Sequence, residues 1–211
     1  MKKYICSNNI HVDEIVKELY DFSKLGGVSI PNALTEEACN DFITEIAVLK
    51  YRFQRVQRVR GRVVQEMETF YIENANTIVD LPDLNEKLSR LQDEYLELYE
   101  KIGALAGFKE RFNSVGLHFY GIGSAGITPH QDFAAGKYLI ASFVLSGNAP
   151  FFVCADRKKT NSVELPSDPG SIVLLRAART EEEQRKRPFH YVPGPMEMER
   201  YSILIRTETK K

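Results

Sequence analysis

The sequence has 211 residues, a length typical of one domain with a single hydrophobic core. Its 28 lysines and arginines nearly balance its 29 aspartates and glutamates, so the formal net charge is −1. This balance excludes a strongly basic protein that coats nucleic acid, and it excludes a protein with a long acidic tail.

The cysteines and the apolar runs indicate the compartment. Cys6, Cys39 and Cys154 are odd in number and far apart, which disfavours a disulfide framework and a zinc knuckle. The two lysines near the start are followed by no apolar stretch, and no apolar run approaches the ~18 residues of a transmembrane helix. We therefore expect a soluble cytoplasmic protein without a secretory signal or a membrane span.

Helical periodicity dominates the first 110 residues. Apolar residues three and four apart predict a helix over residues 13–25, with Asp13 as its N-cap. A short strand is predicted at residues 28–30. Thr35, followed by two glutamates, is a suitable N-cap for a second helix.

The character of the sequence changes near residue 110. Before that point, residues 55–72 predict a strand pair around Gly61, and an apolar stripe predicts a long helix over residues 84–105. After it, short apolar runs alternate with turn residues. These runs predict strands at residues 115–120, 138–145, 151–155, 171–176, 189–192 and 201–206.

The element pattern predicts one α+β domain over residues 1–211. Many short strands with regular turns are typical of a sandwich or barrel, so residues 111–207 are expected to form a double-stranded β-helix (jelly-roll) core. Residues 1–110 are expected to form a mainly helical N-terminal support with short strands, which flanks that core.

Two His-x-Asp triplets occur in the chain. The first, residues 11–13, lies at a predicted helix start, where Asp13 has a structural role as a cap. The second, His130-Gln-Asp132, lies beside predicted strands, where residues i and i+2 point the same way. His190 lies in a later predicted strand and supplies a third ligand. Two histidines and one carboxylate are the facial triad of non-haem Fe(II) oxygenases.

A receptor for a carboxylate follows the last histidine. Arg200 and Ser202 share one side of a predicted strand, and a guanidinium with a nearby hydroxyl binds carboxylates well. Arg206 has the same parity and lies on the same side of the strand.

The sequence resembles the Fe(II)/2-oxoglutarate-dependent dioxygenases in these motifs: the His130-Gln-Asp132 triplet, then His190, then Arg200-Tyr-Ser202. Residues 26–43 and 168–175 also look like the entry to the family's fold and the turn and strand before its distal histidine. The resemblance covers about 95 residues of the C-terminal half and some 20 near the N-terminus. It implies an oxidoreductase with a jelly-roll fold.

The resemblance also implies roles for residues. His130, Asp132 and His190 would hold Fe(II) as the catalytic metal. Arg200 and Ser202 would hold the distal carboxylate of the cosubstrate 2-oxoglutarate, with Tyr120 assisting. Dioxygen would be consumed, an organic substrate would be oxidised, most often by hydroxylation, and succinate and carbon dioxide would be released.

Two branches of that superfamily are compared with the chain. The core is similar to AlkB-type nucleic-acid demethylases, in which a tyrosine before the triplet and a second arginine handle 2-oxoglutarate; Tyr120 and Arg206 match these positions. His118 and Ser202 stand where that branch has asparagines. The Arg-x-Ser pair is closer to branches that modify small molecules. A small-molecule substrate is therefore expected, with an AlkB-like demethylase of nucleic acid as the alternative.

Other interpretations remain beside these. The basic segment Lys50–Arg62 suits a phosphate backbone, an anionic small molecule or a solvated face balanced by acids such as Asp93, Glu94 and Glu97. The segment Arg176–Arg187 is a candidate lid or a disordered surface loop. Without oxidation chemistry, the histidines would suit a cupin-like ligand-binding protein or a zinc hydrolase.

Overall fold

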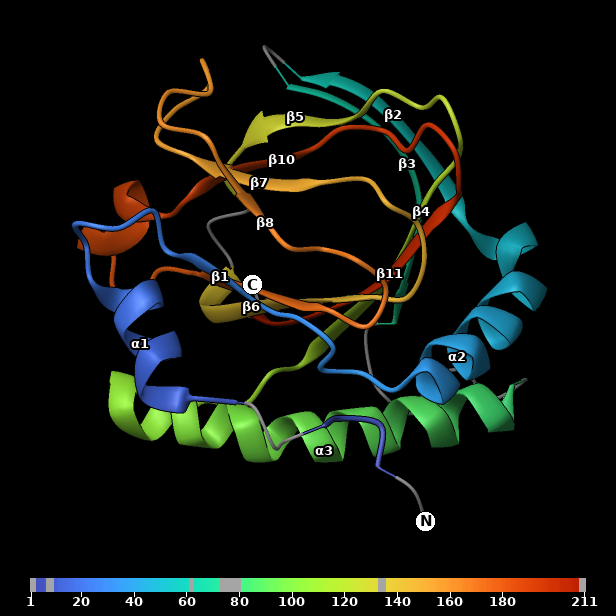
Figure 1. The fold of residues 1–211 in the computed structure, drawn as a ribbon, viewed down its shortest axis with the longest axis horizontal. Coiled ribbons are helices and arrows are strands. Elements are labelled where there is room, and N and C mark those ends of the chain that lie inside the picture. The colour runs from blue at the N-terminus through green and yellow to red at the C-terminus, as the bar shows by residue number, and fades with distance from the viewer. Residues whose placement is uncertain (1–2, 7–9, 61–62, 73–80, 133–135, 209–211) are drawn as a thin grey trace.

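The computed structural model describes residues 3–6, 10–60, 63–72, 81–132 and 136–208. The helices and 3-10 turns are α1 (Val12–Tyr20), α2 (Glu36–Val48), η2 (Lys50–Arg52), α3 (Pro82–Ala106) and η3 (Glu182–Lys186) (Figure 1). The strands are β1 (Gly27–Ile30), β2 (Gln54–Arg60), β3 (Val63–Ile72), β4 (Ser114–Tyr120), β5 (Gly126–His130), β6 (Gly136–Val144), β7 (Phe151–Cys154), β8 (Val163–Leu165), β9 (Ile172–Arg176), β10 (Phe189–Val192) and β11 (Arg200–Glu208).

The strands form one antiparallel sheet in the order β1-β9-β6-β11-β4-β3-β5-β10-β7-β8, and β2 pairs with β3. The sheet rolls up, because β1 at one end packs over β7 and β8 at the other. A Cβ atom on Gly27 would lie 2.6 Å from Val153 Cγ1 and 3.2 Å from Leu165 Cδ1. The result is a nearly closed barrel, which confirms the expected jelly-roll with flanking helices.

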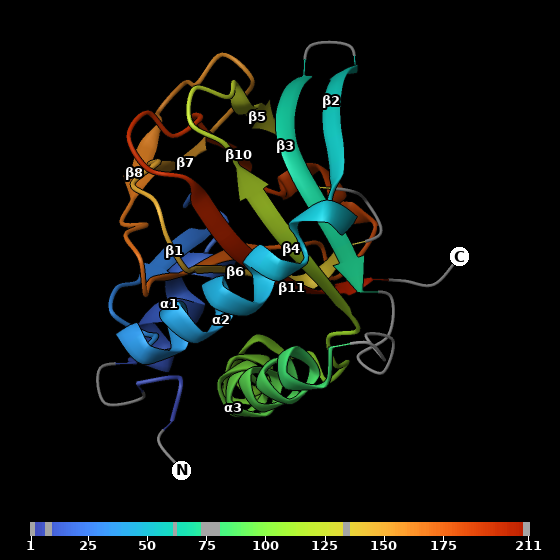
Figure 2. The same ribbon diagram turned by 90° about the vertical axis from the view of Figure 1, so that its right-hand side faces the viewer.

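Helices cover only one wall of this barrel. Figure 2 shows α2 and α3 beneath the wall that contains β4, β6 and β11. The apolar stripe of α3 is buried against that wall, and fully burying one such leucine is worth about 2 kcal/mol. Helix α3 ends at Gly107, whose φ of +82° is the left-handed conformation that glycine adopts without strain.

The alternation of β11 separates a core face from a cavity face. Tyr201, Ile203 and Ile205 pack in the apolar cluster that the helices cover. The alternate residues line the barrel interior, and they are Arg200, Ser202, Leu204 and Arg206. The period of two in this strand therefore places its polar residues inside the barrel.

Several local predictions differ from the structure. Helix α1 begins at Val12 and ends at Tyr20 rather than at residue 25, because the Asp21 carboxylate accepts hydrogen bonds from the amide and hydroxyl of Ser23 and stabilises a turn. Asp13 lies in the first turn of α1, and the N-cap is His11. Strands β5 and β8 were not predicted.

Other local predictions are confirmed. The Thr35 hydroxyl caps α2 by accepting the Ala38 amide at 3.1 Å. The pair β2 and β3 occupies the segment that the sequence assigned to two strands. Among the described helices, none combines the length and the apolar character that crossing a lipid bilayer requires.

Candidate metal centre and pocket

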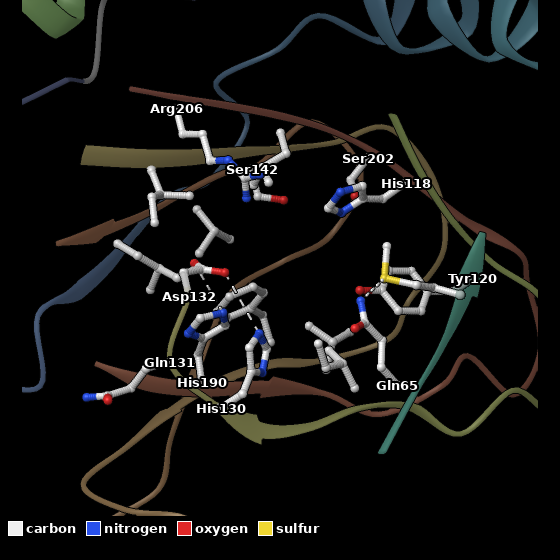
Figure 3. Close-up of a pocket in the computed structure, with 18 of the residues that line it drawn as sticks. Gln65, His118, Tyr120, His130, Gln131, Asp132, Ser142, His190, Ser202 and Arg206 are labelled. Carbon is white, nitrogen blue, oxygen red and sulfur yellow. Dashed lines mark hydrogen bonds and ion pairs between the residues drawn. The ribbon is translucent and has the colours of Figure 1, made fainter. Parts of the chain in front are cut away.

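Two side chains of the second His-x-Asp triplet, His130 and Asp132, converge with His190 inside the barrel. His130 ends β5 and lies directly opposite His190 of β10 in the antiparallel ladder. Asp132 follows two residues after His130. The Asp132 carboxylate oxygens lie 3.9 Å from His130 Nε2 and 3.6 Å from His190 Nε2. One ligand atom from each residue lies within 4.8 Å of the other two, which is a spacing that one metal ion can bridge (Figure 3).

Neighbouring groups orient both imidazole rings. His130 Nδ1 lies 3.0 Å from the Thr128 carbonyl oxygen, so a proton on Nδ1 leaves the Nε2 lone pair facing Asp132. The His190 ring stacks on Phe151 with a centroid distance of 5.6 Å and an interplanar angle of 6°. The structure thus prepares two imidazole nitrogens and one carboxylate for a shared ligand.

The electrostatics of the triad also suit a divalent metal. Burial, together with the adjacent His190, lowers the pKa of His130 to about 4. Burial alone would raise the pKa of Asp132, but His190, His130 and Arg206 outweigh it and lower that pKa. At neutral pH the His130 ring is therefore neutral and Asp132 is an ionised carboxylate, which are the forms that bind a metal. These residues fit Fe(II) by donor type and number.

A reciprocal pair of hydrogen bonds holds the metal-site loop. Gln131 Nε2 donates to the Arg187 carbonyl at 2.6 Å, and Arg187 Nη1 donates back to the Asp132 carbonyl. Arg187 Nε also donates to the Gln184 carbonyl at 2.8 Å. The segment before β10 is thereby fastened to the loop that carries Asp132.

The rest of the predicted lid segment is also anchored. Arg176 donates to the Leu19 carbonyl at 2.8 Å. Arg179 forms a two-pronged ion pair with Glu183 and donates to the Ala106 carbonyl at 2.7 Å. These contacts to α1 and α3 argue against a disordered surface loop.

The triad opens into a cavity of about 400 Å³ within the barrel. That volume lies in the range of sites for small molecules. Apolar side chains make up much of its wall. Those on β6, β9 and β11 are Ile140, Val173, Leu175 and Leu204, and those nearer the triad are Ile127, Phe151 and Val192.

Arg200 is the most deeply buried charge of this cavity. It is 1% exposed and donates from Nη1 to the carbonyls of Ala149 at 2.9 Å and Ser167 at 3.2 Å. Burial lowers its pKa to about 10, so it remains a cation at neutral pH. Tyr120 lies opposite Arg200 across the β4–β11 ladder, and Ser202 is two residues further along the strand.

Arg206 lines the same cavity farther along β11. It is 8% exposed, and its Nε and Nη2 atoms contact the Glu208 carboxylate. The cavity therefore brings together all seven site residues named from the sequence. Further polar lining residues that no motif revealed include Gln65, Ser142 and Arg157. His118, which stands where AlkB-type enzymes have an asparagine, also lines the cavity.

The basic segment Lys50–Arg62 is described only in part, because residues 61–62 and the side chains of residues 51 and 58–60 lie outside the described set. Lys50 pairs with Glu199 at 3.5 Å, and Arg55 pairs with Glu66 at 3.2 Å. The acids that balance these two cations are therefore not those expected from α3. Glu94, for example, accepts the amides of Tyr4 and Ile5.

The comparisons with known proteins identify the fold. No family model and no curated protein matches the chain. A prolyl-4-hydroxylase from Pseudomonas putida matches with a TM-score of 0.67 at 14% identity, over 94% of this chain and 99% of its own. A prolyl hydroxylase from Trichoplax adhaerens, in complex with a hypoxia inducible factor peptide, matches with a TM-score of 0.67 at 13% identity, over 96% of each chain.

A dioxygenase for auxin oxidation from Arabidopsis thaliana matches with a TM-score of 0.64 at 14% identity, over the whole of this chain and 94% of its own. These structures and a member of the 2OG-Fe(II) oxygenase family from Burkholderia pseudomallei share one fold with this chain. The fold implied by the sequence resemblance is therefore confirmed.

Proposed function

We propose that the protein is an Fe(II)- and 2-oxoglutarate-dependent dioxygenase that oxidises a small organic molecule, with hydroxylation as the reaction. The observation that carries this proposal is the triad of His130, Asp132 and His190 inside a barrel of the matching fold, facing a cavity that also contains Arg200. Iron and 2-oxoglutarate, when bound, activate dioxygen and release succinate and carbon dioxide.

The residues of this chain have distinct tasks in that reaction. His130, Asp132 and His190 hold the metal on one side and leave its other side open to the cavity. Arg200 binds the distal carboxylate of 2-oxoglutarate through paired charge-assisted hydrogen bonds, and the hydroxyls of Ser202 and Tyr120 complete the receptor. The apolar walls exclude water, which strengthens each of these interactions.

The size of the cavity favours a small molecule over a polymer. The metal ligands line a cavity of about 400 Å³, a volume in the range of sites for small molecules. Lys50 and Arg55 of the basic segment are paired with carboxylates, so they offer less charge to a phosphate backbone. The Trichoplax adhaerens prolyl hydroxylase of the same fold is in complex with a peptide fragment, so a peptide side chain is the second candidate class.

The cytoplasm is proposed as its compartment. Cys6, Cys39 and Cys154 are all free in the described structure, and two of them are buried. Unpaired buried thiols are typical of a reducing compartment.

An anaerobic titration tests the proposed function. Fe(II) and then 2-oxoglutarate are added to the metal-free protein, and the visible charge-transfer band of the chelate is recorded. We expect a saturable band for the wild type and none for His130→Ala. His11→Ala is the matched control, because it removes the histidine of the other His-x-Asp triplet and should leave the band intact.

The same titration assigns the cosubstrate receptor. Arg200→Met should bind Fe(II) normally but weaken 2-oxoglutarate by about 3 kcal/mol, or roughly a hundredfold, because a paired charge-assisted contact is lost. No band in the wild type, with zinc retained and activity without oxygen, would instead support the hydrolase. Metal binding without any effect of 2-oxoglutarate would support the cupin-like interpretation.

A further inference from the structure

The charges that line the cavity are unbalanced. The lining contains three arginines, Arg157, Arg200 and Arg206, and one carboxylate, that of Asp132. On the proposed function, a divalent metal and a dianionic cosubstrate cancel each other. Asp132 then offsets Arg200 and Glu208 offsets Arg206, which leaves the positive charge of Arg157 in excess in the remaining space. That space repels a cationic substrate and attracts an anionic one.

Arg206 lies too far along β11 to belong to the Arg200 receptor. The two residues are separated by six positions, which is about 20 Å between their Cα atoms in an extended strand. They face different partners, since Arg200 lies opposite Tyr120 and Arg206 lies opposite Ser114 and Ile140. The strand therefore displays two separate cationic positions rather than one.

The guanidinium of Arg206 keeps one edge available to the cavity. Its contacts with Glu208 use Nε and Nη2, so Nη1 can still donate to a ligand. Glu208 is itself outside the cavity lining and neutralises the buried cation. This ion pair offsets the cost of burying the Arg206 cation when no ligand is bound. The position of Arg206 on the cavity wall lets it bind a ligand.

His118 supplies a second group on the same wall. Its Nε2 atom is buried and has no hydrogen-bond partner within the described part of the chain. Burial and the adjacent Arg206 lower the pKa of His118 to about 3, so the ring is neutral. A neutral imidazole protonated on Nε2 donates one hydrogen bond, which a carboxylate oxygen would accept.

Figure 3 shows His118, Ser142 and Arg206 on the wall formed by β4, β6 and β11, with the triad of β5 and β10 on the other side of the cavity. Apolar side chains, Ile140, Val173, Leu175 and Leu204, lie on the same wall or next to it. A ligand between the wall and the metal would therefore present a charged end to Arg206 and an apolar body to these residues.

We propose that Arg206 and His118 bind the carboxylate of the organic substrate, so that the molecule oxidised is a small apolar carboxylic acid. This inference rests on the proposed function and adds the substrate class. It assigns Arg206 to the substrate rather than to 2-oxoglutarate, the role that its match to AlkB-type enzymes implied.

The experiment uses the protein loaded with Fe(II) and saturated with 2-oxoglutarate without oxygen. Hexanoate, phenylacetate and phenylpropanoate are titrated, each beside its primary amide and its amine, and the change in the visible band and in the melting temperature is recorded. At least one acid should bind ten or more times tighter than its amide, the amines should not bind, and the band should persist.

Three variants locate the subsite. Arg206→Gln should weaken the bound acid roughly ten- to a hundredfold, as expected for losing a hydrogen bond to a charged group, while 2-oxoglutarate affinity stays unchanged. Glu208→Gln keeps the guanidinium and should bind the acid at least as well as the wild type. Arg111→Gln is the matched control, because Arg111 pairs with Glu100 on the exposed face of α3.

The outcomes separate the two proposals. No band with Fe(II) and 2-oxoglutarate refutes the proposed function and this inference with it. A normal band without any preference for acids refutes this inference alone. It is also wrong if the acids displace 2-oxoglutarate, if Arg206→Gln loses 2-oxoglutarate affinity, or if Glu208→Gln weakens the acid as much as Arg206→Gln does.

Discussion

His118 makes the stability of the metal-free protein depend on pH. Its pKa is about 3 in the folded protein, mainly because burial disfavours the charged ring, with Arg206 adding repulsion and Asp132 opposing it. In the unfolded chain the pKa of histidine is about 6.5. The unfolded chain therefore takes up a proton first as the pH falls, and stability is present above pH 6.5 and lost below it.

The size of this loss follows from the difference in pKa. Each pH unit below 6.5 costs about 1.4 kcal/mol until the folded protein is protonated too, so about 2 kcal/mol is lost by pH 5. For a domain of this size, that corresponds to a fall of roughly 4–8 °C in melting temperature. His118→Gln cannot take up this proton and should lose correspondingly less.

The assay is urea unfolding of metal-free wild type and His118→Gln at pH 7.5 and pH 5. The difference between their unfolding free energies isolates His118 from the other groups that titrate, because these are common to both proteins. His11→Gln, which changes an exposed histidine before α1, is the matched control for replacing a histidine. Parallel pH profiles for wild type and His118→Gln would refute the assignment of a buried neutral ring.

Three further predictions concern polar side chains. Arg187→Gln should weaken Fe(II) binding about tenfold in the anaerobic titration, because the Asp132 loop loses its donor; unchanged affinity would mean that the loop holds its shape alone. Tyr95→Phe should leave the urea midpoint unchanged or raise it, since the buried hydroxyl has no partner in the described structure, and a lower midpoint would reveal one. Ligand-free Arg200→Met should unfold within about 1 kcal/mol of wild type, because the cost of burying the cation disappears with its two hydrogen bonds; a larger loss would make Arg200 structural.

The sequence predicted the triad better than the strands that hold it. The His-x-Asp spacing occurs twice in the chain, so His130 and Asp132 were recognised from that spacing together with the predicted strands beside them. Strand β5 itself was not predicted, because Gly126 and Pro129 give it the composition of a turn. Its pairing with β10 is what brings His190 opposite His130, and such long-range register has no local signal.

The groups around the triad were harder to predict. Gln65, Ser142 and Arg157 reach the cavity from three different strands or loops, and each is an ordinary surface residue type in sequence. The pairing of Arg206 with Glu208 did have a signal, since the two residues share one side of a strand. The end of α1 at Tyr20 depended on the turn that Asp21 forms, which competes with helix continuation.

The two buried arginines of strand β11 are better explained by ligand binding than by a contribution to the stability of the fold. Its core face requires Tyr201, Ile203 and Ile205 to point toward the helices, so the period of two places Arg200 and Arg206 in the barrel interior. A buried cation is costly unless paired. Glu208 pairs with Arg206, but Arg200 has only two carbonyl acceptors in the described structure and no carboxylate in salt-bridge contact. A dianionic cosubstrate therefore stabilises Arg200, which lacks a counter-ion. Arg206 has Glu208 as its counter-ion, so it can bind a substrate that dissociates after each turnover.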